Sequence, residues 1–385
     1  MTFLERAQKA VCGEHLDGWL FFNFHGRDGT ANRLLGLGEQ TMNSRPWFCF
    51  IPAEGEPVKI VHAIEKKMLD SVPGKTLVYS DRGRLTELLE PLAGTWAAAV
   101  SQTLTVISTL DHGTALYLEG LGFKLVSSAG LIQKTAGVLD EEGFASHERA
   151  AKHLYTCVHR AWEEIVSSTT RGTVLTESTV QGWILDYFRD NGLVTSHPVL
   201  VAAGRHTADP HYEVPENGGP ISPGDVIQFD IWAKEQKAGA IYADISWVGI
   251  MAGTVPPEAQ NIFRIITGAR DRALSFITGN LEKGTPVIGA DVDRITRSFI
   301  EEAGFGPSFL HRTGHGIDTE VHGCGVNMDS TEFPDYREII EGSCFSLEPG
   351  IYLDSFGMRT EINAYRRNGR CIVSGGPVQT RILTL

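Results

Sequence analysis

The stretch Pro223-Gly224-Asp225-Val226-Ile227-Gln228-Phe229-Asp230 combines a turn signal with an apolar run that ends in a carboxylate. A second carboxylate, Asp244, begins the run Ile245-Ser246-Trp247-Val248, and a third, Glu348, follows Cys344-Phe345-Ser346-Leu347. These compositions are typical of β-strands. Because burying a lone carboxylate is costly, we expect each of these to face a partner or a cation.

The C-terminal half carries one imidazole and four carboxylates of metal-ligand type. They are Asp230, Asp244, His315, Glu348 and Glu361. Four carboxylates can balance two divalent cations and leave room for a bridging water of lowered pKa. Mostly oxygen ligands and one His favour Mn²⁺, with Co²⁺, Zn²⁺ or Fe²⁺ as alternatives. Since the chain has 47 acidic residues and 13 His, each of these residues taken singly could instead be a solvated surface group.

These residues lie within an ordered series of motifs that resembles the pita-bread metallopeptidases, the family of methionine aminopeptidase, aminopeptidase P and prolidase. The resemblance covers about residues 145 to 380. The motifs are Pro210-His211-Tyr212, Pro223 to Asp230, Asp244-Ile245-Ser246, His311-Arg312-Thr313-Gly314-His315-Gly316-Ile317, Val321-His322-Gly323, Leu347-Glu348-Pro349-Gly350-Ile351-Tyr352 and Met358-Arg359-Thr360-Glu361.

The resemblance implies a role for each ligand. Asp230 matches a ligand of one metal, and Asp244 and Glu361 match the two carboxylates that bridge both metals. His315 and Glu348 match the ligands of the other metal.

Two further imidazoles, His211 and His322, match family residues that stabilise the tetrahedral intermediate or shuttle protons to it as a bridging hydroxide attacks. Glu348 matches the carboxylate proposed as general base.

His311 and Arg359 resemble residues of the X-Pro-cleaving branch, and the resemblance places both at the substrate. Each has a second interpretation. His311 could be a hydrogen-bonded core imidazole, and Arg359 could form an ion pair with a ligand carboxylate.

Two departures from the family pattern bear on substrate choice. Asp230 and Asp244 are fourteen residues apart where eleven is usual, and we expect the tip of a hairpin to absorb the difference. The residues after Asp244 and Glu361 also differ, giving Ser246-Trp247-Val248 and Ile362-Asn363. Trp247 therefore becomes a residue of interest, and His206 becomes one because it precedes His211.

The chain of 385 residues exceeds what one ordinary core supports, so two domains are expected. Residues 17–132 alternate β-rich runs with helical stretches such as 84–89, which predicts a mixed α/β domain over residues 1–140. The resemblance implies that this domain is creatinase-like. The expected strands include 19–22, 47–51, 58–61 and 116–118.

Residues 141–385 are predicted to form the pita-bread catalytic domain, an α+β fold. Apolar periodicity and cap signals predict four helices, in the order helix-helix-strands twice. The first follows residue 143, the second begins after Thr176, the third begins at Pro256-Pro257 and the fourth covers 290–303. Strands are expected to carry His211, Asp230 and Asp244. The resemblance implies a curved antiparallel sheet with the ligands on its concave face.

Net charge and cysteine usage limit the class of partner. A formal charge of −13 without a dense basic run argues against nucleic acid or an anionic membrane. The six cysteines lack CxxC spacing, which favours reduced thiols, and no apolar stretch is long enough for a membrane span. With no secretory signal expected, we predict a cytoplasmic protein, and the family suggests a homodimer.

The leading functional hypothesis is two-metal hydrolysis of the bond between an N-terminal residue and proline, in a dipeptide or a longer peptide. One alternative is a non-peptide small molecule, cleaved by a C–N hydrolase or a metal-dependent lyase. The other is a non-catalytic binding module, which the complete ligand set disfavours.

Overall fold

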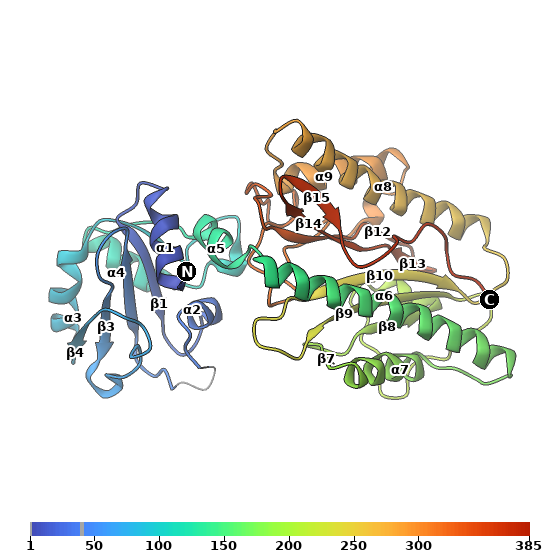
Figure 1. Cartoon of the computed structure of the whole chain (residues 1–385), viewed down its shortest axis with the longest axis horizontal. Helices are drawn as coiled ribbons and strands as arrows, with labels where there is room; N and C mark the ends of the chain where they lie inside the picture. Colours follow the sequence, from blue (N-terminus) through green and yellow to red (C-terminus); the bar gives the residue numbers. More distant parts are fainter. Residues whose placement is uncertain (1, 39–41) are drawn as a thin grey trace. The chain divides into compact units, whose positions relative to one another are not determined.

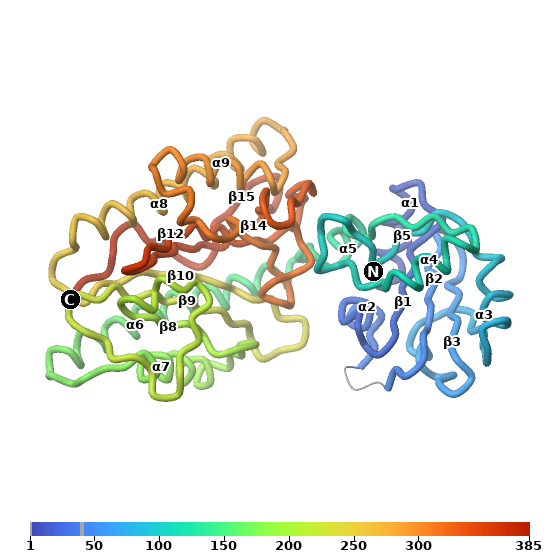
Figure 2. The backbone as a smooth tube through the Cα atoms, turned by 180° about the vertical axis from the view of Figure 1, so that it is seen from behind, coloured from blue at the N-terminus to red at the C-terminus, as the bar shows by residue number. Residues whose placement is uncertain are grey.

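The computed structural model describes residues 2–38 and 42–385 and divides the chain into two compact units, residues 1–136 and 137–385. The division lies four residues before the boundary predicted at residue 140. Figures 1 and 2 show both units from opposite sides.

The first unit is built on a six-stranded mixed sheet in the order β4-β3-β2-β1-β5-β6. The strands are β1 (Gly18–Asn23), β2 (Trp47–Pro52), β3 (Val58–His62), β4 (Lys75–Tyr79), β5 (Thr95–Ala98) and β6 (Lys124–Ser127). The helices are α1 (Phe3–Cys12), α2 (Gly29–Leu34), α3 (Arg82–Leu89), α4 (His112–Gly120) and α5 (Ala129–Ala136). Three of the expected strands and the expected helix are confirmed.

The strand expected at residues 116–118 is wrong, because these residues lie in α4. The Asp111 side chain accepts hydrogen bonds from the backbone N–H and the hydroxyl of Thr114, which caps the helix. Leu118 is fully buried and Leu116 is 54% exposed. A three-residue apolar run is too short for periodicity to separate a strand from a helix.

The second unit contains the four predicted helices, α6 (Glu141–Thr170), α7 (Glu177–Asp190), α8 (Pro257–Glu282) and α9 (Gly289–Glu302). Thr176 caps α7 by accepting from the backbone N–H of Thr179, as predicted, and α8 begins at a proline. The strands of this unit are β7 (Leu193–Val194), β8 (Leu200–Ala203), β9 (Val226–Glu235), β10 (Ala243–Ile250), β11 (Cys344–Leu347), β12 (Gly350–Tyr352), β13 (Gly357–Arg359), β14 (Ile362–Arg367) and β15 (Arg370–Val373).

The two helix pairs pack on overlapping sets of strands, because β9 and β10 contribute residues to the cores of both pairs. Residues of α6 and α7 share one apolar core with β8, β9 and β10, whereas residues of α8 and α9 share others with the C-terminal strands. In both views α8 and α9 lie beside the C-terminal strands and α7 lies beside β8 (Figures 1 and 2). All strand pairs within this unit are antiparallel. The predicted α+β class and the repeated order of helices and strands are confirmed.

Strand β9 presents alternate residues to the two faces of its sheet. Phe229, Ile231 and Ala233 are fully buried in the core shared with α6 and α7. Asp230 and Trp232 therefore lie on the opposite face. Asp230 is in the middle of this strand, as expected of a residue carried by a strand, and β9 extends beyond the apolar run that Asp230 ends. The strand continues because the period-two pattern extends to residue 235 and lets β9 pair with β7.

The extra residues between Asp230 and Asp244 lengthen β9 and form the turn before β10. Asp230 lies opposite Ser246 and Trp232 lies opposite Asp244 in an unbroken antiparallel register. Gly239, with φ of +76°, supplies a left-handed conformation in the turn. The longer spacing between Asp230 and Asp244 therefore leaves the pairing of β9 with β10 unbroken, and the extra residues lie toward the hairpin tip, as expected.

Candidate metal centre and its cavity

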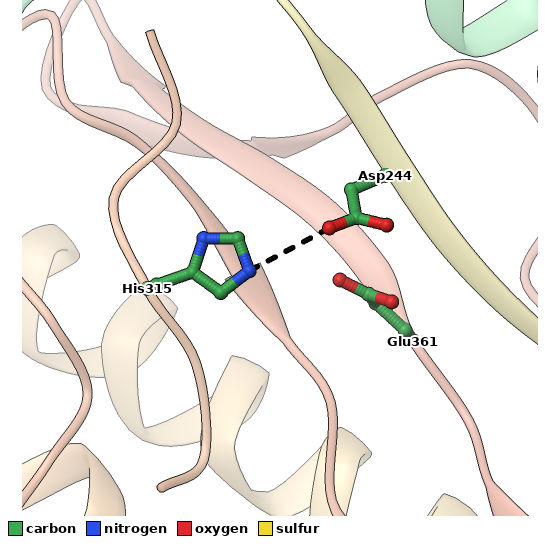
Figure 3. Close-up of side chains that lie close together, drawn as sticks. All are labelled: Asp244, His315 and Glu361. Atoms are coloured by element: carbon green, nitrogen blue, oxygen red, sulfur yellow. Dashed lines mark ion pairs between the residues drawn. The ribbon is translucent and has the colours of Figure 1, made fainter. Parts of the chain in front are cut away.

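Asp244, His315 and Glu361 converge from three separate segments of the second unit. Asp244 is on β10, His315 is in the loop that follows α9, and Glu361 is between β13 and β14. One ligand atom from each of the three lies within 4.8 Å of the others, and the His315 Nε2 is 3.6 Å from Asp244 Oδ2. Figure 3 shows the imidazole and both carboxylates pointing toward one another.

The backbone beside His315 is held against β11. Gly314 approaches so closely that a Cβ there would lie 2.0 Å from the Ser346 carbonyl oxygen, so only glycine fits. The backbone N–H of His315 donates to Ser346 Oγ, and Ser346 N–H donates to the His315 carbonyl. His315 Nδ1 is 3.2 Å from the Gly316 carbonyl oxygen, which makes Nδ1 the donor and leaves Nε2 to the carboxylates.

Glu348 and Asp230 complete the predicted ligand set. Glu348 Oε1 lies 3.3 Å from His315 Nε2. Asp230 Oδ1 is 2.5 Å from Ser246 Oγ, which is also 3.0 Å from Glu361 Oε2. A hydroxyl has one proton, so Ser246 can donate to only one of these carboxylates at a time.

Two carboxylate oxygens of this cluster are buried without a hydrogen-bond partner. They are Asp244 Oδ1 and Glu361 Oε1. Burial raises the pKa of Asp244 well above its usual value, and the charges of Asp230 and Glu348 raise it further. The pKa of Glu361 is raised well above its usual value by burial and by Asp244. Buried oxygens without partners, beside an imidazole and like charges, fit the binding of hard cations.

Arg359 is 5% exposed and contacts the ligand set directly. Its Nη2 forms an ion pair with Asp230, and its Nε donates to Ser246 Oγ at 3.0 Å. Its backbone is fixed by a double hydrogen bond with the Gln228 side chain on β9. These contacts match the second interpretation of Arg359, an ion pair with a predicted ligand carboxylate.

Tyr352 connects Arg359 to His311. Arg359 Nη1 donates to the Tyr352 hydroxyl at 3.0 Å, and that hydroxyl is 2.8 Å from His311 Nε2. His311 Nδ1 donates to the Arg312 carbonyl at 2.7 Å, so Nε2 is left to accept from tyrosine. Burial lowers the pKa of His311 to about 4, which keeps the ring neutral. His311 is outside the cavity lining, and its contact with substrate stays a prediction.

His322 and His211 reach the same cavity from two loops. The His322 ring packs edge-on against His315, with ring centroids 4.4 Å apart. His211 lies in a turn after the short 3₁₀ helix Gly204–Ala208, so the expectation that a strand carries it is wrong. Pro210 and the neighbouring turn residues prevent strand pairing there.

The cavity has a volume of about 490 Å³ and joins the ligand cluster to a less buried wall. Its lining residues are Ser196, His197, Pro210, His211, Asp230, Trp232, Asp244, His315, Glu320, Val321, His322, Glu348 and Arg359.

Glu177 is a positioning residue that the sequence did not reveal. Its carboxylate is fully buried and accepts from the backbone N–H of Ala203 and of Gly219, from the Tyr212 hydroxyl and from His206 Nδ1, at 2.7 to 2.8 Å. These contacts fix both ends of the loop that carries His211. An acidic residue after a helix cap normally faces solvent, so the sequence offered no signal.

Two residues of interest lie away from the cavity. His206 bonds to Glu177 and stacks on Tyr212, and it is absent from the lining. Trp247 is on the opposite face of β10, where its ring packs edge-on against Tyr155 and His159 of α6. Trp232, which sequence reasoning passed over, is the tryptophan that lines the cavity.

Comparison with known proteins gives a consistent family. The family model for metallopeptidase family M24 matches residues 145–365, more than half of the chain. A peptidase of uncharacterised function from Staphylococcus haemolyticus is 30% identical over 328 residues, covering 83% of this chain and 84% of the relative. The Xaa-Pro dipeptidase of Lactobacillus delbrueckii is 30% identical over 173 residues, covering 43% of this chain and 41% of the relative. The chain therefore aligns with less than half the length of that dipeptidase.

Solved structures share the fold across the whole chain. The dipeptidase PepE from Mycobacterium ulcerans has a TM-score of 0.76 at 20% identity and covers 100% of this chain and 97% of its own. The prolidase from Thermococcus sibiricus has a TM-score of 0.68 at 19% identity, with 100% of both chains covered. No helix in residues 2–38 or 42–385 is long and apolar enough to cross a membrane.

Proposed function

Because this chain belongs to metallopeptidase family M24, we propose that it is a dinuclear-metal hydrolase that cleaves the peptide bond between an N-terminal residue and proline. The observation that carries the proposal is the cluster of buried ligand-type side chains beside one cavity, with Asp244 Oδ1 and Glu361 Oε1 left without partners. The similarity to the Lactobacillus delbrueckii Xaa-Pro dipeptidase supports the X-Pro class.

The proposed metal ligands are Asp230, Asp244, His315, Glu348 and Glu361, and the proposed ions are two Mn²⁺. When bound, the ions would polarise the scissile carbonyl and lower the pKa of the attacking water. We further propose a homodimer located in the cytoplasm. We also propose that the first unit is a creatinase-like domain and the second the catalytic domain.

The chain's own groups would handle the proton and the developing charge. Glu348 would accept the proton of the attacking water, because its carboxylate lies beside His315 in the cavity. His211 and His322 line the same cavity and would donate hydrogen bonds to the oxyanion or a proton to the leaving nitrogen. Proline forms a tertiary amide without an N–H, so recognition must rely on shape and on groups around the carbonyl.

We propose that Arg359 contributes to substrate binding indirectly, through its contacts with the proposed ligand Asp230 and with Tyr352. It is buried against Asp230 and Tyr352, so its charge offsets part of the carboxylate excess. Through Tyr352 it also fixes the tautomer of His311, which we propose as a substrate-binding residue near the cavity.

The test is turnover of X-Pro dipeptides and X-Pro-X tripeptides by protein reconstituted with Mn²⁺. Asp244→Ala should abolish cleavage, and Asp70→Ala, an exposed aspartate in the first unit, should leave it unchanged. Cleavage of dipeptides alone would indicate a prolidase, and cleavage of tripeptides an aminopeptidase P. Binding of two metals without X-Pro cleavage would overturn the proposal and favour a non-peptide substrate.

A further inference from the structure

The wall of the cavity away from the metal ligands has a distinct chemistry. We call Ser196, His197, Trp232, Glu320 and Val321 the outer wall. It combines one indole, one imidazole, one hydroxyl, one aliphatic side chain and one carboxylate that is not a predicted ligand.

Trp232 is placed on the outer wall by the register of β9. It follows Asp230 by two residues, so both side chains lie on one face, and it pairs directly with Asp244 across the strands. Its indole Nε1 donates to Ser196 Oγ at 3.3 Å. The bond fixes the polar edge of the indole, and the partly exposed side chain lines the cavity.

Glu320 lies at the outer wall in a loop whose backbone is fixed by two hydrogen bonds. Its backbone N–H donates to Asp318 Oδ1 at 2.8 Å, and the Lys234 ammonium donates to the neighbouring Thr319 carbonyl at 2.6 Å. Lys234 also lies over the Tyr242 ring, 4.6 Å from its centroid. The Glu320 carboxylate itself is exposed, and within the described residues it forms no ion pair and accepts no hydrogen bond.

Glu320 gives this wall a negative charge that the metals would not cancel. Four carboxylates line the cavity, and three of them, Asp230, Asp244 and Glu348, are predicted ligands whose charge would be offset by divalent ions. The fourth is Glu320. An aromatic ring and an unpaired carboxylate that line one wall of a cavity form a combination that can bind an alkylammonium or guanidinium group.

We propose that the outer wall is a subsite for a cationic side chain, Lys or Arg, of the residue that precedes proline. The aliphatic stem lies along Trp232 and Val321, and the charged group faces Glu320. This subsite rests on the proposed X-Pro hydrolysis and adds to it a preference within that substrate class. An acidic side chain in the same position is repelled by Glu320.

The experiment compares Lys-Pro with norleucine-Pro, whose side chain is that of lysine without the ammonium. The expected ratio of their kcat/KM values is about 3 to 30 in the wild type, the combined effect of an exposed cation–π contact and an exposed ion pair. Glu320→Gln should bring the ratio close to one by lowering kcat/KM for Lys-Pro much more than kcat/KM for norleucine-Pro. Glu332→Gln, at another exposed carboxylate outside the cavity, is the matched control and should keep the wild-type ratio.

A second variant tests the aromatic part of the wall. Trp232→Leu should lower kcat/KM for both peptides, because the stem loses its contact, and should also reduce the ratio. Thermal melting of each variant verifies folding.

The outcomes separate this subsite from the proposed function. A wild-type ratio near one, or equal loss of both peptides in Glu320→Gln, overturns the subsite while X-Pro hydrolysis stands. No cleavage of Lys-Pro, norleucine-Pro or Leu-Pro by the Mn²⁺-loaded wild type overturns both.

Discussion

Glu177 and Glu361 are two buried glutamates of the same unit with opposite surroundings. Glu177 is fully buried, and both of its oxygens accept two hydrogen bonds each from the loop that carries His211. Glu361 is 2% exposed, yet Oε1 has no partner and Oε2 shares the hydroxyl of Ser246 with Asp230. The first carboxylate is satisfied by the protein, and the second is satisfied only if something else binds.

The difference separates a structural carboxylate from a proposed ligand. Four donors can offset the cost of burying Glu177, and its charge fixes a long loop. Glu361 has like-charged neighbours and too few donors, so we expect its carboxylate to destabilise the metal-free protein and to be stabilised when cations bind. The same residue type at the same burial therefore predicts opposite effects of mutation, which can be tested.

The largest effect is expected for Glu361→Ala. Removing a proposed bridging ligand should lower X-Pro turnover by about a thousandfold, equivalent to about 4 kcal/mol of transition-state stabilisation. Elemental analysis should show fewer than two metal ions per chain. If the variant retains turnover and both metals, Glu361 is not a metal ligand, and its difference from Glu177 has no functional meaning.

Glu177→Ala should instead act on stability. Two buried backbone donors and the partly buried donors of Tyr212 and His206 lose their acceptor, which we expect to cost about 3–5 kcal/mol, and thermal melting should shift down whether or not Mn²⁺ is present. Glu177→Gln keeps one acceptor oxygen and should lose less. If Glu177→Ala melts like the wild type, the hydrogen bonds to the His211 loop do not stabilise the fold.

The sequence allowed the proposed ligand Glu361 to be predicted, but it did not reveal the structural role of Glu177. Asp244, His315 and Glu361 were identifiable because each lies in a motif of the resemblance, and the structure brings them together. His211, His322, His311 and Arg359 were placed in the same region by the same motifs. The long-range contacts of Glu177 span 26 to 42 residues of chain. No local pattern encodes them.

Secondary structure was predicted correctly where apolar periodicity extends over many residues. It was predicted wrongly where an apolar run is short. The four helices of the second unit have many turns of apolar spacing, and their order was predicted. The run 116–118 is too short to show a period. The face of Trp232 could have been read from the alternation in Asp230-Ile231-Trp232-Ala233, because Ile231 and Ala233 are the apolar partners of a two-residue repeat.

The contrast also predicts a pH dependence for the metal-free protein. Burial and the charges of Asp230 and Glu348 raise the folded-state pKa of Asp244, so the folded state holds this proton more tightly than the unfolded state. Stability from this group is present below its unfolded pKa of about 4 and is lost as pH rises through the folded pKa. Asp244→Asn cannot titrate, so in a chelator it should melt above the wild type, and the gap should widen as pH rises.

The measurement is the melting temperature of both proteins between pH 5 and pH 8, with and without Mn²⁺. A gap of about 2–4 °C per kcal/mol is expected for a unit of this size. Mn²⁺ should reverse the order, since only the wild type retains the full ligand set. If the wild type melts at a higher temperature than Asp244→Asn in chelator at pH 8, the charged Asp244 carboxylate does not destabilise the metal-free protein, and the prediction is wrong.

The smallest effect of a substitution is expected at Tyr352, which contacts both the predicted ligand set and a hydrogen-bonded histidine. Its hydroxyl accepts from Arg359 and donates to His311, so it links the ligand set to a satisfied hydrogen-bond network. Tyr352→Phe leaves His311 Nε2 without its donor and should cost about 1–2 kcal/mol in stability. Because Arg359 keeps its ion pair with Asp230, metal content should stay at the wild-type level. A variant that loses metal would show instead that Tyr352 belongs with the ligands, since the arginine would then depend on the hydroxyl to hold Asp230 in place.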